Sequence, residues 1–331
     1  MVIALLIFGI VCMTAFSLYI NRKEKRSARS WYSERLLFWR IEKNIFTPYD
    51  KPEEFLQKVA VTNEEPYKLP PGLTLICKVE RQIRHGLDCV CLGDPEKKTK
   101  ILYLHGGAYV EQPYLLHWHF LDRLVKMSDA QVIVPLYPKA PIHHYQESFD
   151  KLLLLYSDLV KDNEVQDLIC MGDSAGGGLA LSFSQLLSQH HMPQMKNLIL
   201  LSPWLDVSMG NPSIQVLEKK DPLLQKDYLI AMARAWAGDE DLHNPLLSPI
   251  FGNLRGLPKI SLFIGTHELF LADARKFRAL CLSRGVAIDY HEYPKMNHDF
   301  PLFPIPEAKR ALQEIIEIIK SPYYQEVVDY L

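Results

Sequence analysis

Residues 168–178 read Leu-Ile-Cys-Met-Gly-Asp-Ser-Ala-Gly-Gly-Gly, and this stretch decides the fold of the 331-residue chain. An apolar run typical of a buried strand passes through a glycine-rich turn into the helical pattern of residues 179–188. A serine on such a turn needs very small neighbours, because the strand and the helix pack closely there. Its oxygen also lies near the positive end of the helix dipole. The stretch predicts Ser174 as a nucleophile. A plain glycine-rich turn is the alternative, whereas a phosphate loop is excluded because no Gly-Lys-Ser/Thr follows.

Short apolar runs alternate with helix-length segments along most of the chain. Helix-length segments such as 118–127 and 146–160 separate most of these runs. This alternation predicts an α/β fold with an eight-stranded, mostly parallel sheet and helices on both faces. In such sheets the chemistry is expected in the loops that follow strands. The predicted strands are residues 73–79, 87–92, 101–104, 132–136, 168–171, 198–201, 260–264 and 287–293.

The loop after the third predicted strand reads His105-Gly106-Gly107-Ala108-Tyr109. Acyl transfer needs backbone N–H groups that point at the developing oxyanion, and consecutive glycines let the main chain approach the substrate. We therefore predict an oxyanion hole made by the N–H groups of Gly106, Gly107 and Ala175. His105 is expected to hold this loop by hydrogen bonds, and a tight turn with a structural histidine is the plain alternative.

A catalytic serine needs a histidine base and a carboxylate that orients this base. His298, in the loop after the last predicted strand, is the preferred base, ahead of His267 and His291. Glu268 directly follows the seventh predicted strand and is the preferred acid. Asp273, a few residues later, remains the alternative.

Together these motifs resemble the hormone-sensitive-lipase family of esterases, which have the α/β-hydrolase fold. The hallmarks are His-Gly-Gly at 105–107 and Gly-Asp-Ser-Ala-Gly-Gly at 172–177, and the resemblance extends over roughly residues 70–310. It implies a triad of Ser174, Glu268 and His298. Many members have aspartate where this chain has Glu268, which changes the length of the acid side chain but not its role.

The resemblance also implies a helical cap over a catalytic domain of residues 70–331. The candidates for this cap are residues 21–69, which include linker and helices, and an insertion at about 205–245. Within residues 31–61 the helical spacing is interrupted by two prolines. The apolar residues at this spacing are Leu36, Leu37, Trp39, Ile41 and Ile45, and the prolines are Pro48 and Pro52.

The predicted function is a serine carboxylesterase that acts on short- to medium-chain acyl esters through an acyl-enzyme on Ser174. An amidase or deacetylase with the same triad, and a non-catalytic small-molecule-binding protein, are the alternatives. No metal or organic cofactor is implied, and a homodimer is common in the family. The net charge of −2 gives no indication of a nucleic-acid partner.

The N-terminus differs from the rest of the chain. Residues 1–20 contain no charged side chain, and a helix of this length is long enough to cross a bilayer. Basic residues follow at once, starting with Arg22 and Lys23. The pattern predicts a single-pass N-terminal anchor with the catalytic domain in the cytoplasm. A signal peptide cleaved near Ala15-Phe16-Ser17, and hence secretion, is the alternative.

Overall fold

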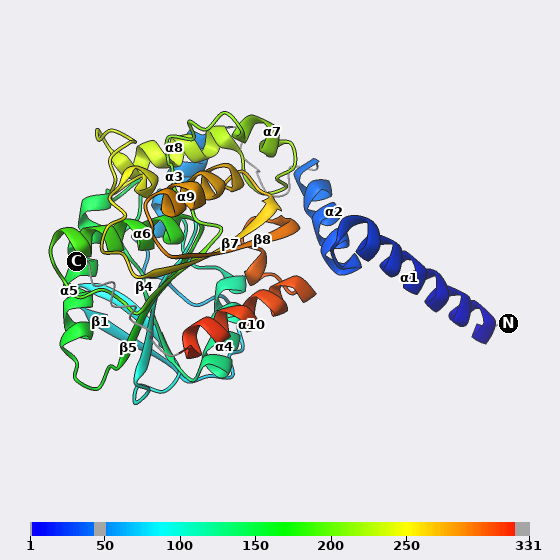
Figure 1. The fold of residues 1–331 in the computed structure, drawn as a ribbon, viewed down its shortest axis with the longest axis horizontal. Coiled ribbons are helices and arrows are strands. Elements are labelled where there is room, and N and C mark those ends of the chain that lie inside the picture. The colour runs from blue at the N-terminus through cyan, green and yellow to red at the C-terminus, as the bar shows by residue number, and fades with distance from the viewer. Residues whose placement is uncertain (1, 43–50, 322–331) are drawn as a thin grey trace.

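The computed structural model describes residues 2–42 and 51–321, and an eight-stranded sheet forms its centre (Figure 1). The strands lie in the order β1-β2-β4-β3-β5-β6-β7-β8. Strand β2 pairs antiparallel with β1 and β4, and every other pair is parallel. The predicted eight-stranded, mostly parallel sheet is therefore confirmed. The strands are β1 (Val79–Arg84), β2 (Leu87–Leu92), β3 (Thr99–Leu104), β4 (Gln131–Pro135), β5 (Asp167–Asp173), β6 (Asn197–Leu201), β7 (Lys259–His267) and β8 (Ile288–Asn297).

Helices cover both faces of the sheet, and each face has its own apolar core (Figure 1). One core contains residues of α4 and α10, and the other contains residues of α5, α6 and α9. Strands buried between two such layers are apolar on both sides, which explains their continuous apolar runs. These helices are α4 (Leu115–Ser128), α5 (Tyr145–Lys161), α6 (Ser174–Gln189), α9 (Leu271–Ser283) and α10 (Pro306–Lys320), and two short 3-10 turns lie at Pro249–Phe251 and Phe300–Leu302.

The remaining helices lie outside these two layers. Helix α3 (Pro52–Glu64) packs against α8 (Lys226–Ala237), and a short α7 (Ile214–Glu218) contacts α9. Helix α2 (Ala28–Glu42) contacts α10. We call α2, α3, α8 and the segment 222–225 the cap. Ile45 and Pro48 of the predicted 31–61 region lie outside the described residues.

The first strand begins later than the sequence predicted. Residues 73–78 form no strand, and β1 is Val79–Arg84. The alternating apolar side chains of residues 73–79 do pack onto the α4 face of the sheet. Their backbone, however, is held by a side chain: Asp122 of α4 accepts hydrogen bonds from the N–H groups of Ile76 (2.9 Å) and Cys77 (2.8 Å). The alternation thus predicted correctly which side chains are buried. The backbone N–H groups of residues 76 and 77, however, bind the side chain of Asp122 and not a neighbouring strand.

The predicted membrane anchor at residues 1–20 is wrong. Helix α1 (Val2–Glu24) continues past the uncharged run, so its last turn carries Arg22, Lys23 and Glu24, and Thr14 and Ser17 interrupt its apolar residues. No helix within residues 2–42 and 51–321 is long and apolar enough to cross a membrane. The membrane localisation predicted from this anchor is wrong for the same reason. Helix α1 extends away from the sheet at one side of the molecule (Figure 1).

Candidate active site

The turn between β5 and α6 places Ser174 at the carboxyl end of the sheet. Ser174 has a φ of +50°, a left-handed backbone conformation that residues other than glycine rarely adopt. The turn is tight because α6 starts directly behind β3. A Cβ at Gly176 would lie 2.0 Å from the carbonyl oxygen of Leu104, so only glycine fits there. The strained serine is thus held by close backbone packing, in the predicted strand–turn–helix setting.

Ser174, His298 and Glu268 lie within hydrogen-bonding distance of one another in series. The Oγ of Ser174 is 2.9 Å from Nε2 of His298, and Nδ1 of His298 is 2.9 Å from Oε2 of Glu268. Because the carboxylate can only accept, Nδ1 of His298 donates to it, and Nε2 of the neutral ring is the nitrogen that can take the serine proton. The structure therefore brings together the three residues that the sequence selected, although they are far apart along the chain.

Glu268 is fixed by donors from two loops, its own and the one that follows β6. Its Oε1 accepts hydrogen bonds from the N–H of Gly265 (2.7 Å) and the hydroxyl of Ser202 (2.9 Å), and its side chain is fully buried. Asp273, the alternative acid, instead accepts a hydrogen bond from Asn211 (2.9 Å) at the start of α9. Burial raises the pKa of Asp273 to about 6. The structure therefore places Glu268, and not Asp273, against His298.

The other candidate histidines are engaged elsewhere. His105 is buried, stacks on Tyr137 at 4.6 Å between ring centroids, and donates from Nδ1 to the carbonyl of Gly106 (2.7 Å). Burial lowers the pKa of His105 well below its usual value, which keeps the ring neutral. His267 is bound to Glu34, and His291 stacks on a strand phenylalanine.

The glycine loop after β3 departs from the prediction at Gly106. Its N–H donates to Oδ1 of Asp173 (3.0 Å), so it is not free to bind an oxyanion. Gly107 and Ala108 line the cavity above Ser174 instead. Within the described chain, their N–H groups donate to no other residue. The donors left open near the serine are thus those of Gly107 and Ala108, with Ala175 at the first turn of α6.

Asp173 received no role from the sequence, although it stands beside the serine in the decisive stretch. Besides Gly106, it accepts a hydrogen bond from the hydroxyl of Tyr103 (2.6 Å) and lies 3.0 Å from Nε2 of His117. Burial disfavours its charge, but His117 and Tyr103 outweigh burial and hold the pKa of Asp173 below its usual value. The sequence feature that could have indicated this role is an aspartate at the end of a buried strand, because an unpaired carboxylate would be costly there.

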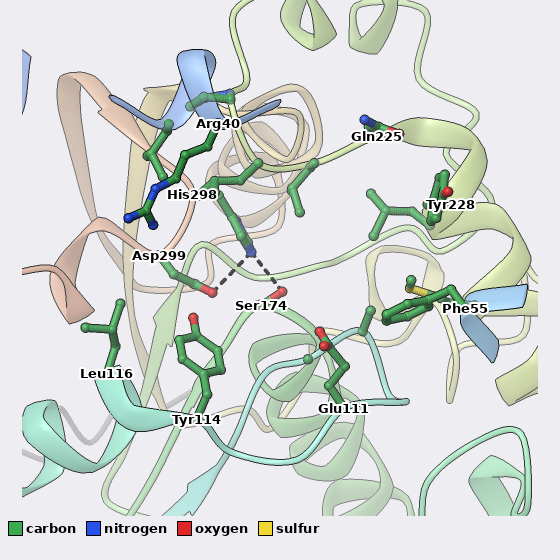
Figure 2. Close-up of a pocket in the computed structure, with 18 of the residues that line it drawn as sticks. Arg40, Phe55, Glu111, Tyr114, Leu116, Ser174, Gln225, Tyr228, His298 and Asp299 are labelled. Carbon is green, nitrogen blue, oxygen red and sulfur yellow. Dashed lines mark hydrogen bonds and ion pairs between the residues drawn. The ribbon is translucent and has the colours of Figure 1, made fainter. Parts of the chain in front are cut away.

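Asp299 is the second residue that the sequence analysis did not single out. Its Oδ2 lies 3.1 Å from Nε2 of His298, on the opposite side from Ser174 (Figure 2). Burial, together with the carboxylate of Asp173, raises the pKa of Asp299 to about 7. Burial alone would lower the pKa of His298, but Asp299 and Glu268 outweigh burial and hold this pKa well above its usual range. Nε2 of His298 thus faces both Ser174 and Asp299, and the charge of Asp299 disfavours the neutral ring that the serine needs.

A cavity of about 550 Å³ opens above Ser174 (Figure 2). We call the loops that follow β3, β5, β7 and β8, which carry the glycine loop and the three residues Ser174, Glu268 and His298, the floor. The floor contributes Gly107, Ser174 and His298, among others, and the cap covers it from above. The cap residues that line the cavity are Leu37 and Arg40 of α2, Phe55 of α3, Pro222, Leu223, Leu224 and Gln225, and Tyr228, Leu229 and Met232 of α8.

A buried polar network joins the cap to the floor. Arg26 donates to Glu34 (2.7 Å), and the other oxygen of Glu34 lies 2.5 Å from Nδ1 of His267, next to the acid. Arg26 also donates to the carbonyl of Lys295 (3.2 Å), three residues before His298. Burial disfavours the charge of Glu34, but His267 and Arg26 outweigh it and hold the pKa of Glu34 below its usual value. Helix α2 is thus attached to the loops of both the acid and the base.

Comparison with known proteins agrees with this geometry. A family model described as the alpha/beta hydrolase fold matches residues 101–302. An esterase from Acinetobacter venetianus is 34% identical over 225 residues, which cover 67% of this chain and 74% of that protein. A candidate esterase from Staphylococcus aureus has a crystal structure with a TM-score of 0.79 and 31% identity, over 82% of this chain and 93% of that one. A hormone-sensitive lipase from a metagenome library gives a TM-score of 0.71 at 27% identity, over 81% and 97%.

The chain belongs to the α/β-hydrolase fold family, and within it to the esterases related to hormone-sensitive lipase. It is an enzyme, an ester hydrolase. The resemblance recognised in the sequence is thereby confirmed.

Proposed function

We propose that this enzyme is a serine carboxylesterase that hydrolyses short- to medium-chain acyl esters through an acyl-enzyme on Ser174. One observation carries the proposal: an unbroken hydrogen-bond series from Ser174 through His298 to the buried Glu268, at the floor of a cavity. A serine hydroxyl is a weak nucleophile unless a base accepts its proton, and the base needs a fixed tautomer. The series supplies both.

In the proposed reaction, the Oγ of Ser174 attacks the ester carbonyl while Nε2 of His298 takes its proton. The carbonyl oxygen becomes negatively charged and accepts hydrogen bonds from the N–H groups of Gly107, Ala108 and Ala175. His298 then gives its proton to the leaving alcohol. In the second half, a water molecule loses a proton to His298 and attacks the acyl-enzyme. The bond to Oγ breaks, His298 returns the proton to Oγ of Ser174, and the carboxylic acid leaves.

The size and lining of the cavity support the proposed acyl length. Its wall between α3 and α8 is mostly apolar, with Phe55, Leu224, Leu229 and Met232. A cavity of about 550 Å³ lies within the range typical of small-molecule sites, so it accommodates short and medium chains better than long ones.

Activity on a series of p-nitrophenyl esters, from acetate to palmitate, tests the proposal. We expect the wild-type enzyme to hydrolyse the short and medium esters and to lose kcat/KM for palmitate. Ser174→Ala should lower kcat by at least about ten-thousandfold while thermal unfolding remains cooperative. A fluorophosphonate probe should label the wild-type enzyme but not this variant. Substantial ester hydrolysis by Ser174→Ala would disprove the acyl-enzyme, and amide substrates of the same acyl series separate an esterase from an amidase.

A further inference from the structure

Asp221 is a buried carboxylate that the proposed reaction does not use. It lies between α7 and α8, directly before the cap segment 222–225, and only 5% of its surface is exposed. In the described part of the chain, neither Asp221 nor its partner Leu269 lines the cavity. Any effect of Asp221 on the reaction therefore passes through the groups that it holds.

Three backbone N–H groups donate to this carboxylate. Its Oδ1 accepts from Leu223 (2.8 Å) and Leu224 (3.0 Å), which belong to the cap segment. Its Oδ2 accepts from Leu269 (2.9 Å), which is 48 positions away in the chain. Among the described residues, no side chain forms a hydrogen bond or ion pair with Asp221. The two oxygens thus hold two different parts of the chain.

The contacts of Oδ1 support one wall of the cavity. Residues 222–225 all line the cavity, and in the view of Figure 2 Gln225 lies above Ser174. These four residues belong to no helix or strand, so helical or sheet hydrogen bonds do not fix their backbone. The turn that Asp221 closes with Leu223 and Leu224 supplies this support instead.

The contact of Oδ2 reaches the acid loop, by which we mean residues 268–270 between β7 and α9. Leu269 directly follows Glu268 and is fully buried. Gly265 and the hydroxyl of Ser202 hold the carboxylate of Glu268, whereas Asp221 holds the backbone on its other side. The acid that orients His298 is therefore fixed at its side chain and at the next peptide group.

The charge of Asp221 acts on the base as well. Burial raises the pKa of Asp221 to about 6, and the positive charge of His298 and the three N–H groups oppose this rise. The attraction between Asp221 and His298 is mutual, so the carboxylate favours the charged form of His298. His298 takes this form once it holds the serine proton.

We propose that Asp221 is a positioning residue that joins the cavity wall 222–225 to the acid loop. One side chain would thus set both the fit of the ester and the placement of Glu268. The inference rests on the proposed esterase function and extends it to a residue that touches neither the substrate nor the triad.

Two variants separate the two contacts. Asp221→Asn has one oxygen left, and the orientation that keeps two hydrogen bonds directs this oxygen at Leu223 and Leu224 and the NH₂ group at Leu269. We expect kcat for p-nitrophenyl butyrate to fall about tenfold, because the acid loop loses its contact, with KM within about twofold of the wild type. Asp221→Ala loses both contacts, so kcat should fall at least as far and KM should rise at least about threefold.

Asp162→Asn is the matched control. Oδ1 of Asp162 accepts from the N–H of Glu164 (3.0 Å) in an exposed turn, and the described residues show no second loop bound to it. Its kcat and KM should equal those of the wild type. A kcat of Asp221→Asn within twofold of the wild type would overturn the proposal, as would a rise in KM without a fall in kcat. Thermal unfolding establishes that each variant is folded.

Amide hydrogen exchange, followed by NMR on enzyme labelled with 15N-leucine, tests the contact without reference to activity. In the wild type, Leu269 should exchange slowly, and fast exchange there would overturn the proposal without any variant. In Asp221→Asn, exchange should accelerate at Leu269 while Leu223 and Leu224 keep their rates. If this pattern is found in an enzyme that hydrolyses no ester, the proposed function fails and the connection through Asp221 stands. Unchanged exchange at Leu269 in Asp221→Asn overturns the connection even if the wild type is an active esterase.

Discussion

The floor and the cap of the cavity are constructed differently. On the floor, each functional group is fixed by contacts within its own loop or with an adjacent strand, as when Gly265 donates to Glu268 or Gly106 to Asp173. In the cap, α2 is attached by the side chains of Arg26 and other residues to loops more than 200 positions away. From this difference we expect substitutions on the floor to change mainly kcat, and substitutions that loosen the attachment of α2 to change mainly KM.

The sharpest test of the floor compares two buried carboxylates in neighbouring positions. Glu268→Gln keeps the size of the acid but can present N–H to Nδ1 of His298, which favours the wrong tautomer. We expect kcat to fall by about a thousandfold or more. Asp273→Asn removes a carboxylate that contacts Asn211, not His298, and should change kcat by less than about threefold. Steady-state kinetics measure kcat of both variants. A larger loss of kcat in Asp273→Asn than in Glu268→Gln would identify Asp273 as the acid.

The second test concerns Asp173, which supports the glycine loop. Asp173→Asn keeps the oxygen that accepts from both Gly106 and Tyr103, but it replaces the oxygen that faces His117 with an NH₂ group and removes the charge. Because this loop carries the proposed oxyanion donors, we expect kcat to fall by about ten- to a hundredfold, with little change in KM. Tyr103→Phe, which removes one hydrogen bond to the same carboxylate, should have a smaller effect. An unchanged kcat in Asp173→Asn would mean that the loop holds its shape without this carboxylate.

Most of the floor was predictable because its residues stand at strand ends, which the apolar runs mark in the sequence. Ser174, Glu268 and His298 were selected in this way, and the structure brings them within hydrogen-bonding distance in series. The role of Asp173 was not, because it depends on register: β3 pairs with β5 so that Leu104 lies opposite Gly172, which brings Gly106 next to Asp173. No local pattern contains that information.

The cap and the N-terminus were less predictable. The attachment of α2 depends on side chains such as Glu34 and His267 that are 233 positions apart, and no periodicity indicates such pairs. At residues 1–20 the composition suggested a membrane anchor, and it did not show that the helix would continue to Glu24. The apolar alternation at 73–79 identified buried side chains, but Asp122 replaced the strand partner.

A smaller effect is expected at Asp299, on the floor beside the base. His298 must be neutral to accept the serine proton, so kcat/KM falls as the pH drops below the pKa of His298. Asp299 raises this pKa, and Asp299→Asn should therefore move the acidic limb of the kcat/KM profile to lower pH. The profile measured with a neutral ester from acid to alkaline pH tests this, and a shift of the limb toward higher pH would contradict the assigned role.

The smallest effect on kcat is expected in the cap. Glu34→Gln removes one of the two anionic partners of the buried Arg26 and leaves Glu24 as the other, which should cost about 2 kcal/mol of stability at neutral pH. Leu37 and Arg40 follow on the same helix and line the cavity, so KM should rise about threefold while kcat stays nearly constant.

The pKa of Glu34 is lowered in the folded enzyme, so its stabilising contribution exists above the unfolded value of 4.5 and is lost as the pH falls through the folded value. The difference in melting temperature between the wild type and Glu34→Gln should accordingly be large at neutral pH and disappear in acid. A difference that stays constant with pH would mean that Glu34 contributes through packing alone, and that the cap is not held by the charge of this network.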